Sequence, residues 1–152
     1  PSRFLGQVRD RAMILVDTGA WLALADRGDA YHARCREFFR RNREPLMTTY
    51  PVPVECVHLM FIRIGVAKTL GWVETLGTQG VGVFVMGADH LPRLTALMRQ
   101  YSDLPMDLAD ASLVLLAEEN GEGRIVSTDE RDFHAYRWKN QHPFRNLLLE
   151  LG

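Results

Sequence analysis

The run Met13-Ile14-Leu15-Val16-Asp17 is apolar up to its last residue, which is a carboxylate. A short apolar run followed directly by small residues such as Gly19 and Ala20 is typical of a buried strand that leads into a helix. Asp17 is then expected at the carboxyl end of the strand, pointing out of the sheet. Helix capping explains Asp17 equally well, because Asp is a favoured N-cap residue.

The rest of the chain alternates between strand-like and helix-like segments. Further strands are predicted at about residues 45–49, 81–86, 124–128 and 144–149. Helices are predicted at about residues 19–25, 32–41, 51–62, 66–76, 89–101 and 107–119, with a helical turn at 131–135. Such alternation indicates a parallel sheet covered on both faces. The predicted fold class is therefore α/β, a three-layer sandwich in which helices flank a parallel sheet of about four or five strands.

A length of 152 residues fits one domain with one core. Residues 1–12 lie outside the pattern and are interpreted as an N-terminal extension or an expression remnant, which leaves 13–152 as the single domain. The apolar runs are too short to cross a bilayer, and no leader-like segment is visible, so a cytoplasmic protein is expected. Cys35 and Cys56 are too few for a disulfide framework or a zinc set and are expected to be buried.

The net charge of −1 argues against a general nucleic-acid coat protein. Of the 18 basic residues, however, only Lys68 and Lys139 are lysine, and arginine suits planar phosphate recognition better. Several arginines crowd one short segment: Arg34, Arg36, Arg40, Arg41 and Arg43. A solvated helix face is the simpler interpretation of this segment, and a phosphate or partner contact is the alternative.

Carboxylates recur where predicted strands end and predicted helices begin. Asp129 directly follows a predicted strand, as Asp17 does. Glu55 falls in the first turn of its predicted helix, and Asp107 and Asp110 share a face of another. In a parallel α/β fold these positions lie on one edge of the sheet, where ligands bind. Acids far apart in sequence would therefore meet, and such a cluster requires a cation, usually a hard divalent metal.

Each acid also has a structural interpretation. Glu55 would interact favourably with its helix dipole. Asp107 would serve as an N-cap, with Asp110 in the first turn. The apolar residues that follow Asp110, at 111–116, suggest a half-buried carboxylate and so favour function at this position. The prediction of a metal site depends on all of these acids being expected at one edge of the sheet, and no single acid would be sufficient for it.

Other chemistries fit the sequence poorly. Phosphate-loop, dinucleotide-binding and G-x-S-x-G motifs are absent from it. The five histidines have no close metal-ligand spacing, and His58 on an apolar helix face is expected to be a hydrogen-bonded core residue. Ligation by oxygen alone favours Mg²⁺ or Mn²⁺.

Four segments in this order resemble a PIN domain, with the greatest similarity to VapC-type toxins of bacterial toxin–antitoxin pairs. They are Val16-Asp17-Thr18-Gly19-Ala20-Trp21, Thr48-Thr49 leading to Glu55, Asp107-Leu108-Ala109-Asp110-Ala111, and Ser127-Thr128-Asp129 ending in Arg131-Asp132-Phe133. The resemblance extends from about residue 13 to the C-terminus. It implies a Mg²⁺- or Mn²⁺-dependent endoribonuclease that hydrolyses RNA phosphodiesters.

The resemblance also implies roles for particular residues. The catalytic acids are Asp17, Glu55, Asp110 and Asp129, and Asp107 joins them as a metal ligand that replaces or supports Asp110. Thr18, Thr128 and Asp132 are expected to support the metal shell. Flanking RNA phosphates are expected to contact Arg34, Arg36, Arg40 and Arg131.

Expected partners are an RNA substrate, a cognate antitoxin that fills the acidic groove, and a second copy of the chain in a homodimer. Two alternatives remain open at this point. One is a PIN-like scaffold without catalysis that binds protein or RNA. The other is a phosphotransfer enzyme with Asp17 as nucleophile, which is disfavoured because Gly19 stands where a second Asp is usual.

Overall fold

The computed structural model describes residues 13–150. The prediction made for residues 1–12 lies outside the described residues. Five short parallel strands form the central sheet in the order β3-β2-β1-β4-β7. They are β1 (Ile14–Val16), β2 (Leu46–Thr49), β3 (Gly82–Phe84), β4 (Arg124–Val126) and β7 (Arg145–Asn146). The first strand lies at the centre, with Leu15 in register with Met47 on one side and with Ile125 on the other.

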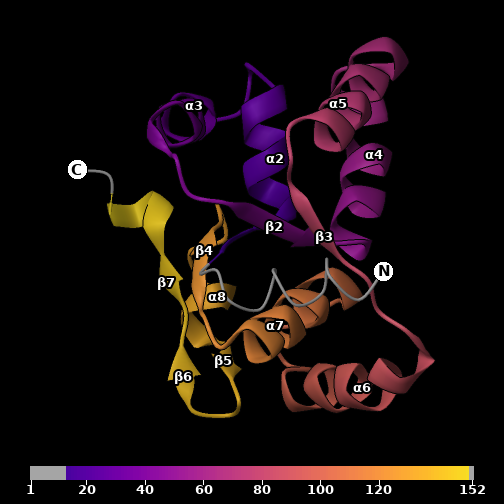
Figure 1. Cartoon of the computed structure of the whole chain (residues 1–152), viewed down its shortest axis with the longest axis vertical. Helices are drawn as coiled ribbons and strands as arrows, with labels where there is room; N and C mark the ends of the chain where they lie inside the picture. Colours follow the sequence, from indigo (N-terminus) through magenta and orange to yellow (C-terminus); the bar gives the residue numbers. More distant parts are fainter. Residues whose placement is uncertain (1–12, 151–152) are drawn as a thin grey trace.

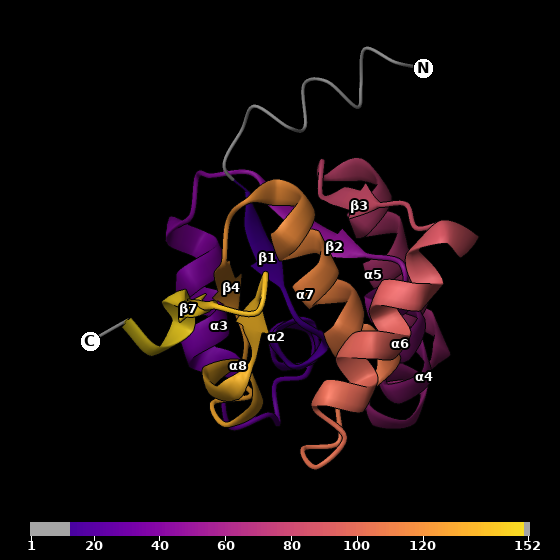
Figure 2. The same cartoon turned by 90° about the horizontal axis from the view of Figure 1, so that it is seen from below.

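Helices cover both faces of this sheet (Figure 1). One face carries α2 (Thr18–Ala25), α3 (His32–Arg41), α4 (Pro51–Arg63) and α5 (Val66–Thr78). The other carries α7 (Leu108–Asn120), with α6 (Leu91–Gln100) packed beside it, and the short α8 (Asp132–Ala135). In the view from below, α7 lies in front of the central strands (Figure 2). The predicted three-layer α/β sandwich is therefore confirmed.

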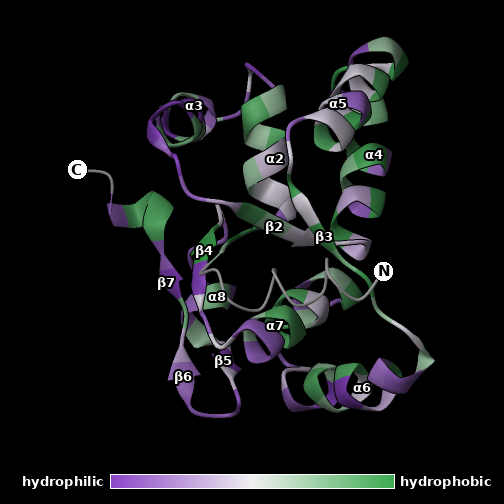
Figure 3. Cartoon of the chain, in the orientation of Figure 1, coloured by the Kyte–Doolittle hydropathy of each residue, from purple (hydrophilic) through white to green (hydrophobic). Residues whose placement is uncertain are grey.

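Helix α7 is buried on nearly every side, since Ala109 and all residues from 111 to 117 are buried. It lies between the sheet and α6, which explains why its sequence lacks a polar stripe. Asp107 caps its first turn and Gly121, at a φ of 65°, ends it in the left-handed conformation. Figure 3 shows hydrophobic residues on β4 and along parts of α2, α4, α6 and α7, and hydrophilic residues on β6 and β7.

The C-terminal region differs from the prediction. Instead of one strand at 144–149, the chain forms an antiparallel hairpin of β5 (Arg137–Trp138) and β6 (His142–Pro143), then β7 and a 3₁₀ turn at Leu147–Glu150. Lys139 and Asn140 make the hairpin turn with positive φ. The side-chain Oδ1 of Asn146 accepts the backbone N–H of Leu148, so β7 bends into the 3₁₀ turn after two residues.

The other deviations are shorter elements. The strand predicted at 81–86 spans only 82–84 and is half-buried at the sheet edge, and the strand predicted at 124–128 ends at Val126. The helix predicted from residue 89 begins with a 3₁₀ turn at Ala88–His90. Both cysteines are buried and unpaired, as predicted. None of the described helices is long and apolar enough to cross a membrane.

Candidate metal-dependent active site

Asp17 connects β1 to α2 and lies at the centre of the carboxyl edge of the sheet. Its side chain is 6% exposed. Oδ1 accepts the backbone N–H of Thr18 at 2.7 Å, and Oδ2 accepts the hydroxyl of Ser127 at 2.9 Å. Burial raises the pKa of Asp17 to about 6, although both hydrogen bonds favour the charged form. Asp17 is therefore both the predicted helix cap and a member of the acidic cluster.

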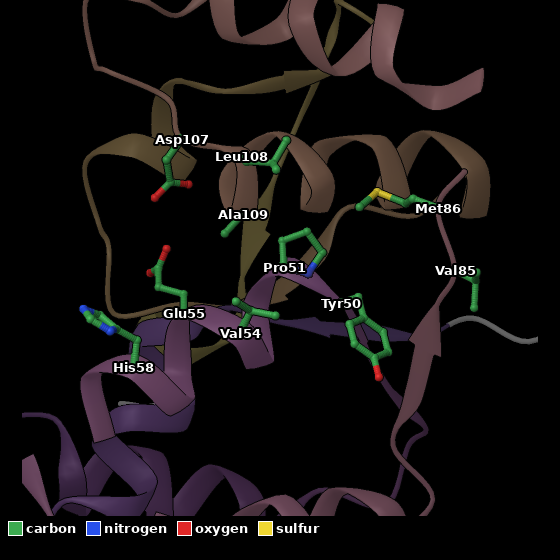
Figure 4. Close-up of a pocket in the computed structure, with 10 residues that line it drawn as sticks. All are labelled: Tyr50, Pro51, Val54, Glu55, His58, Val85, Met86, Asp107, Leu108 and Ala109. Carbon is green, nitrogen blue, oxygen red and sulfur yellow. The ribbon is translucent and has the colours of Figure 1, made fainter. Parts of the chain in front are cut away.

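Glu55 lies on α4 and faces Asp107. Figure 4 shows the two carboxylates pointing toward each other across one end of a pocket. Burial and then the charge of Asp107 raise the pKa of Glu55 to about 7. The prediction of Glu55 in the first helical turn was wrong, because α4 begins at Pro51 and its first turn holds no acidic residue. The helix dipole therefore does not explain Glu55.

Asp107 and Asp110 form a reciprocal cap at the start of α7. Oδ1 of Asp107 accepts the backbone N–H of Asp110 at 2.8 Å, and Oδ2 of Asp110 accepts that of Asp107 at 3.4 Å. Asp107 is exposed, whereas Asp110 is half-buried, as the apolar continuation of the helix predicted. Burial, followed by the charges of Asp17 and Asp107, raises the pKa of Asp110 to about 8.

Asp129 lies beside the cluster, and its charge contributes to raising the pKa of Asp17. Its own carboxylate is partly engaged, because Oδ1 accepts the backbone N–H of Asp132 at 2.8 Å at the start of α8. Burial and the proximity of Asp129 raise the pKa of Asp132. These two acids therefore form the outer side of the cluster formed by Asp17, Glu55 and Asp110.

The two threonines predicted to support the site do different things. The Thr18 hydroxyl is buried near Glu55 and favours the charged form of that carboxyl, whose pKa burial raises. Thr128 instead packs against Gly19, so closely that a Cβ atom added at Gly19 would overlap its Oγ1. The hydroxyl that contacts the carboxylates belongs to Ser127, which donates to Asp17 and accepts the backbone N–H of Asp129 at 3.0 Å.

Sequence reasoning missed Ser127 and also Tyr136, whose hydroxyl contacts Asp110 at 3.2 Å. Ser127 had a signal, since it follows the last residue of β4 and begins the run Ser127-Thr128-Asp129. The supporting role expected of Thr128 came from the family resemblance alone. Tyr136 carries no local signal.

The predicted phosphate-binding arginines differ in their surroundings. Arg40 and Arg41 both pair with Glu37 on the exposed face of α3, which agrees with the solvated-face interpretation. Nε of Arg131 lies 3.7 Å from Oδ1 of Asp132, at the rim of the cluster. Arg34 and Arg36 are exposed on α3.

Beside Arg131, the loop before α3 contacts the loop before α8. The Tyr31 hydroxyl donates to Glu130 at 3.3 Å. The charge of Glu130 raises the pKa of Tyr31, and the nearby charge of Arg34 opposes this shift. The start of α3 therefore lies close to the loop that carries Asp129.

A pocket of about 710 Å³ opens beside Glu55 and Asp107. Its apolar wall includes the exposed side chains of Tyr50, Val54, Val85 and Leu108 (Figure 4). His58 also lines the pocket and is exposed, so the prediction of a core histidine was wrong. The reason is that α4 turns this face toward the pocket rather than toward the sheet.

The carboxylates fit a hard divalent cation by their chemistry. Within residues 13–150, no three His, Cys, Asp or Glu side chains are already arranged as a complete metal-binding set. The donors at the site are nevertheless all oxygen, and no basic residue is among the main groups that shift the pKa of Asp17, Glu55 or Asp110. Mutual repulsion without a resident positive charge is the condition that a divalent cation relieves.

The family described as "PIN domain" matches residues 14–139 of the sequence. The chain therefore belongs to the PIN domain family. Among curated proteins it is 27% identical over 124 residues to "Ribonuclease VapC26" of Mycobacterium tuberculosis, which covers 82% of this chain and 92% of that protein.

Among solved structures, the crystal structure of Mycobacterium tuberculosis VapC20, described as a sarcin-ricin loop cleaving toxin, superposes with a TM-score of 0.71. Its sequence is 22% identical, and the match covers 76% of this chain and 89% of that one. The chain therefore shares its fold with a VapC protein of known structure.

Proposed function

We propose that this protein is a Mg²⁺- or Mn²⁺-dependent endoribonuclease and the toxin of a VapC-type toxin–antitoxin pair. One observation carries the proposal: Asp17, Glu55 and Asp110 come from three different elements and meet at one edge of the sheet, where burial and the charges of Asp17 and Asp107 raise the pKa of both Glu55 and Asp110. Burying like charges at a shared position costs free energy, and such arrangements are typical of functional sites. Membership of the PIN family and the similarity to Ribonuclease VapC26 support the same interpretation.

The cation would be held by Asp17, Glu55, Asp107 and Asp110, with Asp129 on the outer side. When bound, it supplies charge neutralisation at the phosphate and a bound water of lowered pKa. The protein itself contributes orientation. Ser127 holds Oδ2 of Asp17, and the backbone of Thr18 holds Oδ1, so the central carboxylate cannot rotate freely.

Arginines around the acidic cluster would hold the RNA on either side of the reacting phosphate. Arg131 beside Asp132 and Arg34 near Tyr31 have positions that suit this role. Arg36 and Arg40 lie farther along α3 and would contact phosphates farther from the cleaved bond. Phosphate contacts of this type position the RNA without reading its sequence.

Protein partners are proposed on the same basis. An antitoxin would cover the acidic cluster, and a second copy of the chain would form a homodimer. The exposed apolar side chains on and beside α4, including Tyr50, Val54, Phe61 and Ile62, support protein contacts.

The decisive experiment measures cleavage of total RNA and synthetic oligoribonucleotides by the purified chain with Mg²⁺, with Mn²⁺ and with EDTA. Cleavage that requires the cation is expected, and sequencing the new RNA ends after brief induction would identify the target. Calorimetry with MnCl₂ distinguishes the alternative of an inactive scaffold, which would bind the ion weakly or not at all.

A further inference from the structure

Tyr136 contacts the acidic cluster from outside any motif that the sequence revealed. It follows α8 and is fully buried. Its hydroxyl donates a hydrogen bond of 3.2 Å to Oδ2 of Asp110. The ring is held edge-on against Tyr101, at 5.0 Å between centroids, and against Phe133, at 5.1 Å. The phenol therefore has a defined position that the surrounding rings maintain.

The hydrogen bonds to Asp110 are unequally distributed over its two oxygens. Oδ2 accepts the hydroxyl of Tyr136 and, at the longer distance of 3.4 Å, the backbone N–H of Asp107. Within the described part of the chain, Oδ1 accepts no hydrogen bond. The carboxylate is thus anchored through one oxygen, and the other is left free for a ligand.

We propose that Tyr136 is a positioning residue, which orients the carboxylate of Asp110 so that Oδ1 can bind the divalent cation. The assignment rests on the proposed function. A carboxylate that ligates a metal is commonly fixed by a hydrogen bond to its other oxygen, and loss of such a partner weakens metal binding. Without the phenol, only the longer backbone contact would restrain Asp110.

Tyr101 provides a matched control in the same aromatic cluster. Its hydroxyl accepts the backbone N–H of Arg137 at 3.0 Å and, among the described residues, makes no hydrogen bond to a carboxylate. Tyr101→Phe and Tyr136→Phe each remove one hydroxyl and keep the ring. A purely structural role for Tyr136 would therefore give similar results for both variants.

The experiment titrates MnCl₂ into the metal-free protein by calorimetry and also measures RNA cleavage as a function of Mn²⁺ concentration. Tyr136→Phe is expected to raise the Kd for Mn²⁺ by about 10-fold or more. Its kcat is expected to approach the wild-type value once Mn²⁺ is saturating. Tyr101→Phe is expected to keep the wild-type Kd, and thermal unfolding in EDTA checks that both variants are folded.

The outcomes separate this assignment from the proposed function. Failure of the wild-type chain to bind Mn²⁺ and to cleave RNA would overturn both. Normal binding and cleavage by the wild type, with an unchanged Mn²⁺ affinity in Tyr136→Phe, would overturn only the assignment of Tyr136. An equal loss of affinity in the two variants would also overturn it, because the loss would then come from the aromatic packing.

Discussion

The hydroxyl of Ser127 donates a 2.9 Å hydrogen bond to Oδ2 of Asp17, across 110 positions of the chain. The bond joins the ends of β1 and β4, which are neighbouring parallel strands. Because the same hydroxyl accepts the backbone N–H of Asp129, one side chain links two of the acids that the sequence predicted. This side of the carboxylate cluster is thus tied to the carboxyl edge of the sheet.

The substitution Asp17→Asn is expected to abolish RNA cleavage and growth toxicity while the protein stays folded. Loss of one central metal ligand should reduce kcat/KM by about a thousandfold, equivalent to ~4 kcal/mol. Relief of charge repulsion should leave the melting temperature of the metal-free protein equal or higher. Asp103→Asn, at an exposed position outside the cluster, is the control. Metal-dependent cleavage retained by Asp17→Asn would contradict the proposed function.

The stability of the metal-free protein is expected to fall as the pH rises from about 4 to about 8. The pKa values of Asp17, Glu55 and Asp110 are raised in the folded state to about 6, 7 and 8, from ordinary values of 3.8, 4.5 and 3.8. In this window the folded chain binds more protons than the unfolded chain, so the free energy of unfolding decreases with increasing pH.

Thermal unfolding in EDTA across this pH range, repeated with MnCl₂, measures the effect. The added cation should restore most of the stability lost at the upper end. Asp110→Asn should flatten the metal-free profile, since it removes the group with the largest rise in pKa. A metal-free profile that is equally steep in Asp110→Asn would show that other groups control the pH dependence.

Ser127 and Thr128 should differ in their importance for activity. Ser127→Ala removes the hydrogen bonds to Asp17 and Asp129, and we expect cleavage to fall by about 10- to 100-fold. Thr128→Ala should stay close to wild type, because this side chain packs against Gly19. Initial cleavage rates at a fixed Mn²⁺ concentration compare the two. A larger loss in Thr128→Ala would restore the role that the family resemblance implied for Thr128.

Gly19→Ala is expected to destabilise the protein by about 1–3 kcal/mol, because the added methyl group would overlap Oγ1 of Thr128. The double variant with Thr128→Ala should recover most of this loss in urea unfolding. Gly71→Ala, in the interior of α5 with open space around it, is the control and should be neutral or stabilising by up to about 1 kcal/mol. Equal losses in the single and double variants would rule out the proposed overlap.

Asn146 is expected to stabilise the end of β4. Its side chain accepts the backbone N–H of Ser127 at 3.2 Å and donates to the carbonyl of Ser127 at 2.8 Å. Asn146→Ala would leave both backbone groups without these partners, at a cost of about 1–3 kcal/mol in the free energy of unfolding. Asn146→Asp keeps the acceptor but places a carboxylate oxygen against the carbonyl of Ser127, so it should lose at least as much, and a stability equal to that of wild type in either variant would contradict the role of Asn146. Chemical denaturation of the three proteins provides the comparison.

The sequence by itself determined the alternation of strands and helices and the clustering of the acids. Hydrophobic periodicity and helix capping depend only on residues close together in the sequence. The strand that ends before Asp17 and the helix that starts after Asp107 could therefore be predicted. Parallel pairing then brings these chain ends to one edge, so the meeting of Asp17 with Asp110 could be predicted from topology.

Only the tertiary structure decided which neutral side chains hold those acids. Ser127 reaches Asp17, and Tyr136 reaches Asp110 across 26 positions. A hydrogen bond depends on distances of a few ångströms and on side-chain direction, which the packing of β4, α7 and α8 sets and which no local pattern records. The family resemblance implied a supporting hydroxyl at Thr128, whereas the packing also brings the hydroxyl of Ser127 to Asp17.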